Sequence, residues 1–110
     1  MGITYFVSEN SGILISVDTG KKEVKFYRRW KPEEFNYYAS YHLQTLCKDS
    51  VFHNYASGDR EFKIRIEFLV PLRIDVWQRR HVPNGQYDRI TDLKETSIAT
   101  DYGNSIRIRQ

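Results

Sequence analysis

The stretch that decides the fold is FKIRIEFLVPLRIDV, residues 62–76. Every even-numbered residue in it is apolar, whereas charged residues occupy positions 63, 65, 67, 73 and 75. This period of two is typical of a strand that buries one face. A two-residue hairpin inside the stretch would move the apolar residues to odd positions, because the residues that flank such a loop share a face. We therefore expect one long strand, or two collinear strands, bent at Pro71.

Shorter alternating segments lie on both sides of this strand. Three strands joined by tight glycine-containing turns are expected before position 31, as an antiparallel meander, at residues 3–8, 13–17 and 22–30. Weaker strand signals follow the long strand at residues 86–90 and 95–100, and a clean alternating strand is expected at residues 105–109. The segment 51–59 mixes aromatic residues with Asn, Ser and Gly, and we interpret it as a partly buried loop.

A helix is predicted over residues 31–48. Pro32 and the two glutamates after it are typical of a first helical turn. Apolar residues then recur at helical spacing, at Phe35, Tyr38, Ala39, His42, Leu43 and Leu46. The elements together predict a single α+β domain over residues 1–110, with about six strands in the order βββαβββ and one helix packed on one face of a curved antiparallel sheet.

Composition favours a small globular protein. The 110 residues fit one domain, and an aromatic content of 15% is higher than in disordered chains. No apolar run approaches the roughly 18 residues of a membrane span, and the N-terminus lacks the pattern of a secretory signal. Cys47 has no second cysteine to pair with, which fits a reducing compartment, and we expect it to be buried and inert. We expect a cytoplasmic protein without a membrane partner.

The signals for catalysis are sparse. His42 lies in the apolar stripe and is expected in the core, whereas His81 follows Arg79 and Arg80 in a basic cluster. A histidine beside arginines is typical of phosphodiester chemistry, with the imidazole as acid or base and the guanidinium stabilising charge, although a solvated strand end has the same sequence. Two Glu-x-Lys pairs, Glu23-Val24-Lys25 and Glu61-Phe62-Lys63, match a nuclease metal motif but also occur by chance on charged strand faces. We therefore assign no catalytic residue, metal or cofactor.

Two clusters interleave aromatic and basic residues, at positions 26–31 and 77–81. Planar rings stack on bases, guanidinium groups pair with phosphates, and Tyr, Trp and Arg also dominate protein–protein hot spots. Tyrosines on the far side of the predicted helix extend this surface. The predicted partner-binding residues are Tyr27, Arg29, Trp30, Tyr37, Tyr41, Trp77, Arg79, Arg80 and His81.

Three functions follow from these residues. The first is a non-enzymatic binding module that inhibits or assists a protein or a protein–nucleic acid complex, comparable in size and composition to an immunity protein or a viral anti-defence protein. The second is binding of RNA or single-stranded DNA, which the net charge of +3 permits. The third is a small basic ribonuclease or toxin domain that uses His81 or His53 with Arg79, Arg80 and Tyr87. Edge strands also allow a homodimer by strand pairing.

Overall fold

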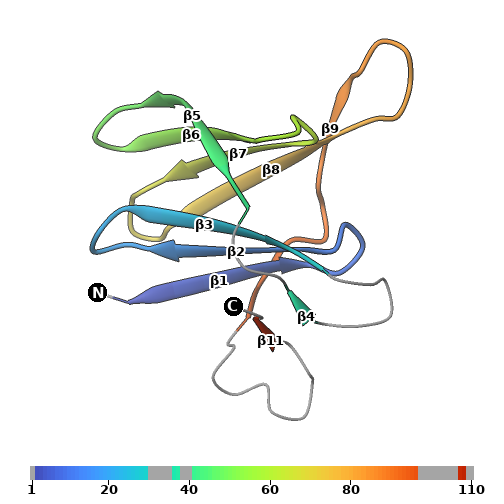
Figure 1. The fold of residues 1–110 in the computed structure, drawn as a ribbon. Coiled ribbons are helices and arrows are strands. Elements are labelled where there is room, and N and C mark those ends of the chain that lie inside the picture. The colour runs from blue at the N-terminus through green and yellow to red at the C-terminus, as the bar shows by residue number, and fades with distance from the viewer. Residues whose placement is uncertain (1, 30–35, 38–40, 97–106, 109–110) are drawn as a thin grey trace. The chain divides into compact units, whose positions relative to one another are not determined.

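A computed structural model describes residues 2–29, 36–37, 41–96 and 107–108, and for residues 36–37 and 107–108 it describes the backbone alone. Within these ranges the chain forms β-strands and no helix (Figure 1). The chain divides into two compact units. One consists of Met1–Tyr41 and Asp92–Gln110, and the other consists of His42–Thr91. The predicted α+β class is therefore wrong, because the described residues form an all-β structure.

The first unit contains a four-stranded antiparallel sheet of order β10-β1-β2-β3. Its strands are β1 (Ile3–Ser8), β2 (Ile13–Asp18), β3 (Glu23–Arg28) and β10 (Lys94–Thr96). The predicted meander of the first three strands is confirmed, and so is a strand near position 95. Two short strands, β4 (Asn36–Tyr37) and β11 (Arg107–Ile108), pair in parallel in the same unit.

Strand β2 is the centre of this sheet and is buried from Ile13 to Val17. On one side of the sheet, Leu14 packs in a cluster with Val7 and Tyr27, and Tyr5 lies against it. Both faces of β2 are apolar, apart from Ser16, as expected for a strand that is covered on both sides.

The second unit is a five-stranded antiparallel sheet in which sequential strands are neighbours, β5-β6-β7-β8-β9. Its strands are β5 (Leu43–Lys48), β6 (Phe52–Ser57), β7 (Phe62–Glu67), β8 (Arg73–Arg79) and β9 (Tyr87–Arg89). The buried face of β7 and β8 carries Phe62, Ile64, Ile66 and Val76, each at most 1% exposed. The alternation is thus a buried sheet face within β7 and β8, as predicted, but not over all of residues 62–76, because Val70 in the loop between these strands is fully exposed.

The single long strand predicted over residues 62–76 is a hairpin instead. Strands β7 and β8 pair antiparallel, with Ile64 opposite Val76 and Ile66 opposite Ile74. The loop of residues 68–72 joins them and contains a cis peptide bond between Val70 and Pro71. A loop with an odd number of residues keeps the apolar side chains at even positions on both strands, so the sequence parity that excludes a two-residue turn does not exclude this one.

The predicted helix over residues 31–48 is also wrong where the structure describes it. Residues 43–48 form β5, which pairs with β6 and has a register shift between Thr45 and Cys47. The side chains expected to be buried against a sheet are exposed: His42 and Cys47 lie at the surface, and Leu46 is 48% exposed. Residues 31–35 and 38–40 lie outside the described part of the chain.

The segment 51–59, predicted to be a loop, contains strand β6. Its inward positions carry His53, Tyr55 and Ser57, all buried. The His53 ring shares a hydrogen bond of 2.8 Å with the Tyr55 hydroxyl, and Ser57 donates to Asp59 and accepts from the Phe62 amide. Two of the three inward side chains are polar, and hydrogen bonds compensate for their burial. The alternation of buried and exposed residues in β6 therefore does not appear in the sequence as a hydrophobic pattern.

Asp92 fixes the turn after β1 in the first unit. Its carboxylate accepts hydrogen bonds from the Ser8 hydroxyl at 2.6 Å and the Asn10 amide at 3.0 Å. Burial acts to raise the pKa of Asp92, but these bonds, its own amide and the charge of Lys94 outweigh it, so the pKa lies below the ordinary 3.8. The ionised form therefore stabilises the folded state.

Replacement Asp92→Asn is expected to lower the free energy of unfolding at pH 7 by about 1–2 kcal/mol, since charge-assisted hydrogen bonds are lost. A lowered pKa contributes stability that is complete above pH 3.8 and is lost as the pH falls through the folded-state value. Urea unfolding of both proteins between pH 7 and pH 2.5 measures this. A difference that stays constant over that range contradicts the assignment.

Candidate functional site

The outer face of strands β7, β8 and β9 is the strongest candidate for a binding surface. Because alternate residues of a strand point to opposite faces, the residues between the buried Ile64, Ile66 and Val76 lie on the other side of the sheet. We call this surface the basic–aromatic face. It consists of Lys63, Arg65, Glu67, Arg73, Asp75, Trp77, Arg79, Tyr87 and Arg89.

The pairing of the strands places one cation of the basic–aromatic face on each side of the Trp77 ring. Trp77 lies opposite Lys63 on one neighbouring strand and opposite Arg89 on the other. Arg79 lies opposite Tyr87, and the Lys63 ammonium lies 4.3 Å from the centre of the Tyr87 ring. The three cations are exposed and the two rings are half-buried, which holds the rings in place at the surface.

Positive charge is concentrated on this face. Five cations stand against the two carboxylates of Glu67 and Asp75, a net charge of +3, which equals the net charge of the whole chain. The remainder of the protein is therefore balanced. The carboxylates pair with cations at the surface, with Arg65 and Glu67 3.6 Å apart and Arg89 and Asp75 3.4 Å apart. The arginine ends of these pairs are exposed although the carboxylates are partly buried, and pairs near the surface contribute on the order of 1 kcal/mol, so the cations stay accessible to other anions.

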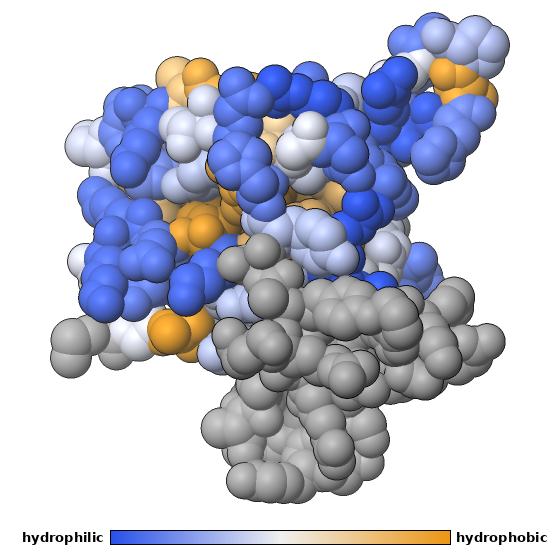
Figure 2. Space-filling view, viewed as in Figure 1, coloured by the Kyte–Doolittle hydropathy of each residue, from blue (hydrophilic) through white to orange (hydrophobic). Residues whose placement is uncertain are grey.

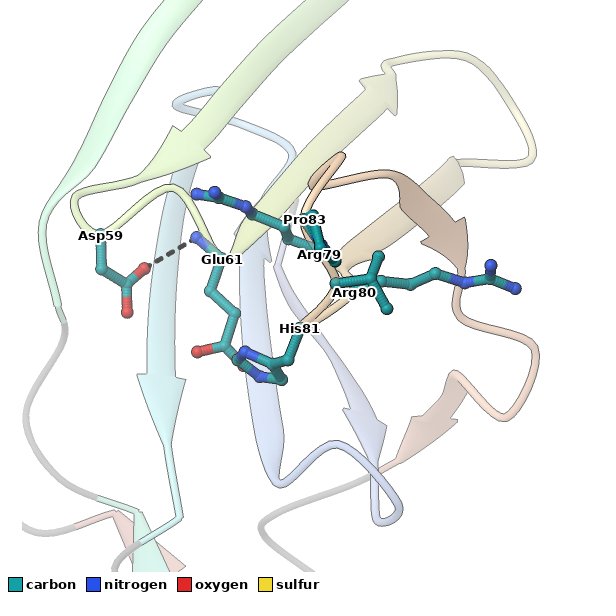
Figure 3. A pocket seen from close by; sticks show the side chains of 7 residues that line it. Asp59, Glu61, Arg79, Arg80, His81 and Pro83 are labelled. Atoms are coloured by element: carbon teal, nitrogen blue, oxygen red, sulfur yellow. Dashed lines mark hydrogen bonds between the residues drawn. The ribbon is translucent and has the colours of Figure 1, made fainter.

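A pocket of about 360 Å³ lies at one end of the same sheet (Figure 3). The turn between β6 and β7 and the loop after β8 line it. Its lining residues are Asp59, Glu61, Arg79, Arg80, His81, Val82 and Pro83. Figure 2 shows the loop after β8 as a mostly hydrophilic projection, within which Val82 is 44% exposed.

Hydrogen bonds hold the walls of this pocket together. The Glu61 amide donates to the Asp59 carboxylate at 3.0 Å, and the Gln78 side-chain amide donates to the Glu61 carboxylate at 2.9 Å. The Arg79 amide donates to the Glu61 carbonyl at 2.8 Å, which ties the end of β8 to the start of β7. The pocket therefore has a fixed backbone frame on two sides.

The two arginines of the pocket have different surroundings. Arg80 forms an ion pair with Asp88 of β9, and Figure 3 shows its side chain directed away from Glu61 and His81. Arg79 lies on the basic–aromatic face and its guanidinium passes close to Gly85. Among the described residues, no carboxylate is in ion-pair contact with Arg79. Arg79 is thus the guanidinium that both the face and the pocket share.

The predicted partner-binding residues divide between surface and core. The expected exposure of Arg79, Arg80 and His81 is confirmed, and these three residues meet at the pocket. Tyr27 was expected at the surface but is 6% exposed, because it packs against Leu14 in the core of the first unit.

The other members of the first cluster and of the predicted helix do not form a described surface. Arg29 is half-buried and donates to the Glu9 carbonyl at 2.9 Å. Trp30 and the side chain of Tyr37 lie outside the described residues, and Tyr41 is 44% exposed. The binding surface therefore depends on β7 to β9 alone.

His53, one of the candidates for catalysis, has a structural role. His53 is 1% exposed, and its ring makes T-shaped contacts with the rings of Tyr55 and Phe68. The burial of Tyr55 raises its pKa.

Within residues 2–29, 36–37, 41–96 and 107–108, no three His, Cys, Asp or Glu side chains are grouped to hold a metal. Over the same ranges, no helix has the length and apolar character needed to cross a membrane.

Arg65 and Arg89 belong to the candidate face although no sequence pattern singled them out, and Lys63 was noted only as part of a Glu-x-Lys pair. Lys63 and Arg65 stand at the odd positions of the alternating stretch, where they look like a solvated strand face. Only the strand register reveals that Lys63 and Arg89 lie beside Trp77, whereas Arg65 lies opposite Asp75 with its guanidinium 4.6 Å from the centre of the Phe52 ring.

Gly85 places the loop after β8 and allows Arg79 to approach it. Its φ angle of +58° lies in the left-handed region, and an added Cβ would lie 3.0 Å from the Arg79 Nε. Replacement Gly85→Ala is expected to lower the free energy of unfolding by about 1–2 kcal/mol, from the backbone conformation, and to displace the flexible Arg79 side chain.

The matched control is Gly58→Ala, whose Cβ would meet His42 at an ordinary 3.8 Å. We expect it to change stability by less than about 0.5 kcal/mol. Urea unfolding distinguishes the two variants, and equal losses would contradict the role of the left-handed conformation at Gly85.

Comparison with known proteins identifies no relative: no family model, curated protein or solved structure matches the chain. We therefore infer a function for the basic–aromatic face and the pocket from the chemistry of their residues.

Proposed function

We propose that the protein binds single-stranded nucleic acid on the basic–aromatic face of β7, β8 and β9. The observation that carries this proposal is the cross-strand row of Lys63, Trp77 and Arg89, with Tyr87 beside it. Rings on an exposed sheet stack with bases regardless of sequence, and cations beside them neutralise the phosphates between those bases. A single strand exposes both groups at once, whereas a duplex hides its bases.

The charge of the face supports a polyanionic ligand. The charged residues of this one surface sum to +3, which equals the net charge of the whole chain, although the chain as a whole is only mildly basic. Clustered cations raise the local concentration of a polyanion and release counterions from it on binding. A neutral protein partner would gain nothing from this excess.

Docking to a protein partner is a second candidate that uses the same exposed Trp and Arg residues. Such docking needs an aromatic centre that excludes water. Of the rings expected at the surface, Tyr27 is buried in the core. Trp77 and Tyr87 lie among five cations, an arrangement that favours a nucleic acid over a protein.

Replacement Trp77→Leu is expected to weaken binding of a short single-stranded oligonucleotide by about 5-fold to 100-fold, the range for loss of one stacked base. Replacement Arg89→Ala is expected to weaken binding and to make the salt dependence less steep, because one fewer phosphate is neutralised. Fluorescence anisotropy with labelled 12-nucleotide RNA and DNA, at 50 and 200 mM salt, measures both effects.

The matched control for Arg89 is Lys25→Ala, which removes an exposed strand cation from the other sheet. Equal losses from both charge variants would show that binding follows net charge and not this face. No binding by the unaltered protein at 50 mM salt would reject the proposal and favour a protein partner.

A further inference from the structure

We infer that the pocket at the end of β8 cleaves RNA by transferring the phosphodiester to the neighbouring 2′-hydroxyl. This inference rests on the proposed binding of single strands, because the basic–aromatic face would deliver the substrate. The pocket gathers an acid–base pair that the binding function does not require, Glu61 and His81, beside Arg79, which the pocket shares with the face.

The position of Arg79 connects the face with the pocket. Arg79 lies opposite Tyr87 on the basic–aromatic face and also lines the pocket. A strand that stacks on Trp77 and Tyr87 therefore has one of its next phosphates beside the Arg79 guanidinium. Planar guanidinium groups bind phosphate oxygens through two parallel hydrogen bonds, and they stabilise the extra charge that develops on phosphorus during transfer.

Glu61 is placed to act as the base. Its carboxylate is oriented by the hydrogen bond from Gln78, and its backbone is fixed by the bonds to Asp59 and Arg79. A general base must be held within hydrogen-bond reach of the proton that it removes, and this frame supplies the rigidity. The residue is half-buried, so water and substrate still reach the pocket wall that it forms.

His81 is placed to act as the acid. It follows the end of β8 by two residues, is exposed, and lines the same pocket as Glu61 (Figure 3). The backbone around it is held because the Arg80 amide donates to the Gln86 carbonyl at 2.7 Å and the Gly85 amide donates to the Val82 carbonyl at 2.9 Å. Imidazole is the side chain best suited to exchange a proton near neutral pH.

The transfer balances without a further reactant. Glu61 takes the proton of the 2′-hydroxyl while the 2′-oxygen forms a bond to phosphorus. The bond from phosphorus to the 5′-oxygen breaks, and His81 in its protonated form gives that oxygen its proton. The products are a 2′,3′-cyclic phosphate and a free 5′-hydroxyl, and proton exchange with water restores both side chains.

The test uses the full chain with a labelled single-stranded RNA, with the same sequence as DNA, and with a chelator present throughout. We expect cleavage of the RNA to a cyclic phosphate and no cleavage of the DNA, which lacks the 2′-hydroxyl. Replacements His81→Asn and Glu61→Gln are each expected to lower the cleavage rate by roughly 10²-fold or more, the usual contribution of a positioned acid or base. Anisotropy should show that both variants still bind the RNA.

The matched control is His42→Asn, an exposed histidine of the same unit that does not line the pocket. It should cleave at the unaltered rate. Intact RNA that is nevertheless bound by the unaltered protein would overturn this inference and leave the binding function standing, whereas absence of binding would reject the proposed function itself. Cleavage that survives both pocket replacements, or that His42→Asn lowers equally, would overturn the assignment of the pocket.

Discussion

The register between β7 and β8 is the constraint on which the second unit depends. It sets Ile64 against Val76 in the interior and Lys63 against Trp77 on the opposite face. A shift by one residue would bury Lys63 and Arg65 and expose Ile64 and Ile66, and an unpaired buried charge costs several kcal/mol. The hydrophobic requirement of the interior therefore also places the cations and rings of the basic–aromatic face, so the stability of the unit and its proposed function depend on the same pairing.

Local patterns predicted the parts of the fold that local interactions determine. The three-stranded meander at the N-terminus was predicted because its turns are short and its strands adjoin in sequence. The alternation in residues 62–76 identified the buried side chains of β7 and β8 but neither the exposure of Val70 nor the hairpin, because the five-residue loop leaves the parity unchanged. The distinction between one bent strand and two paired strands lies in a non-local contact, which periodicity does not encode.

The predicted helix failed for a related reason. Phe35, Tyr38, His42 and Leu46 repeat at helical spacing, but intrinsic propensity and a one-sided pattern are weak beside pairing with an existing strand. Strand β6 supplies that pairing for residues 43–48, and β6 was itself hidden because His53 and Ser57 fill buried positions with satisfied polar groups. One unrecognised strand thus caused the error in its neighbour.

In the candidate site too, residues close in sequence could be predicted together, whereas residues brought together by strand pairing could not. Arg79, Arg80 and His81 adjoin in sequence and were predicted together, whereas Lys63 and Arg89 meet Trp77 only through the sheet. The face is also partly occupied before any ligand arrives, since Arg89 pairs with Asp75 and Lys63 covers Tyr87. Such exposed contacts contribute at most about 1 kcal/mol, so a phosphate can replace them at little cost. They hold the long side chains over the sheet beforehand, which reduces the conformational entropy that binding would otherwise lose.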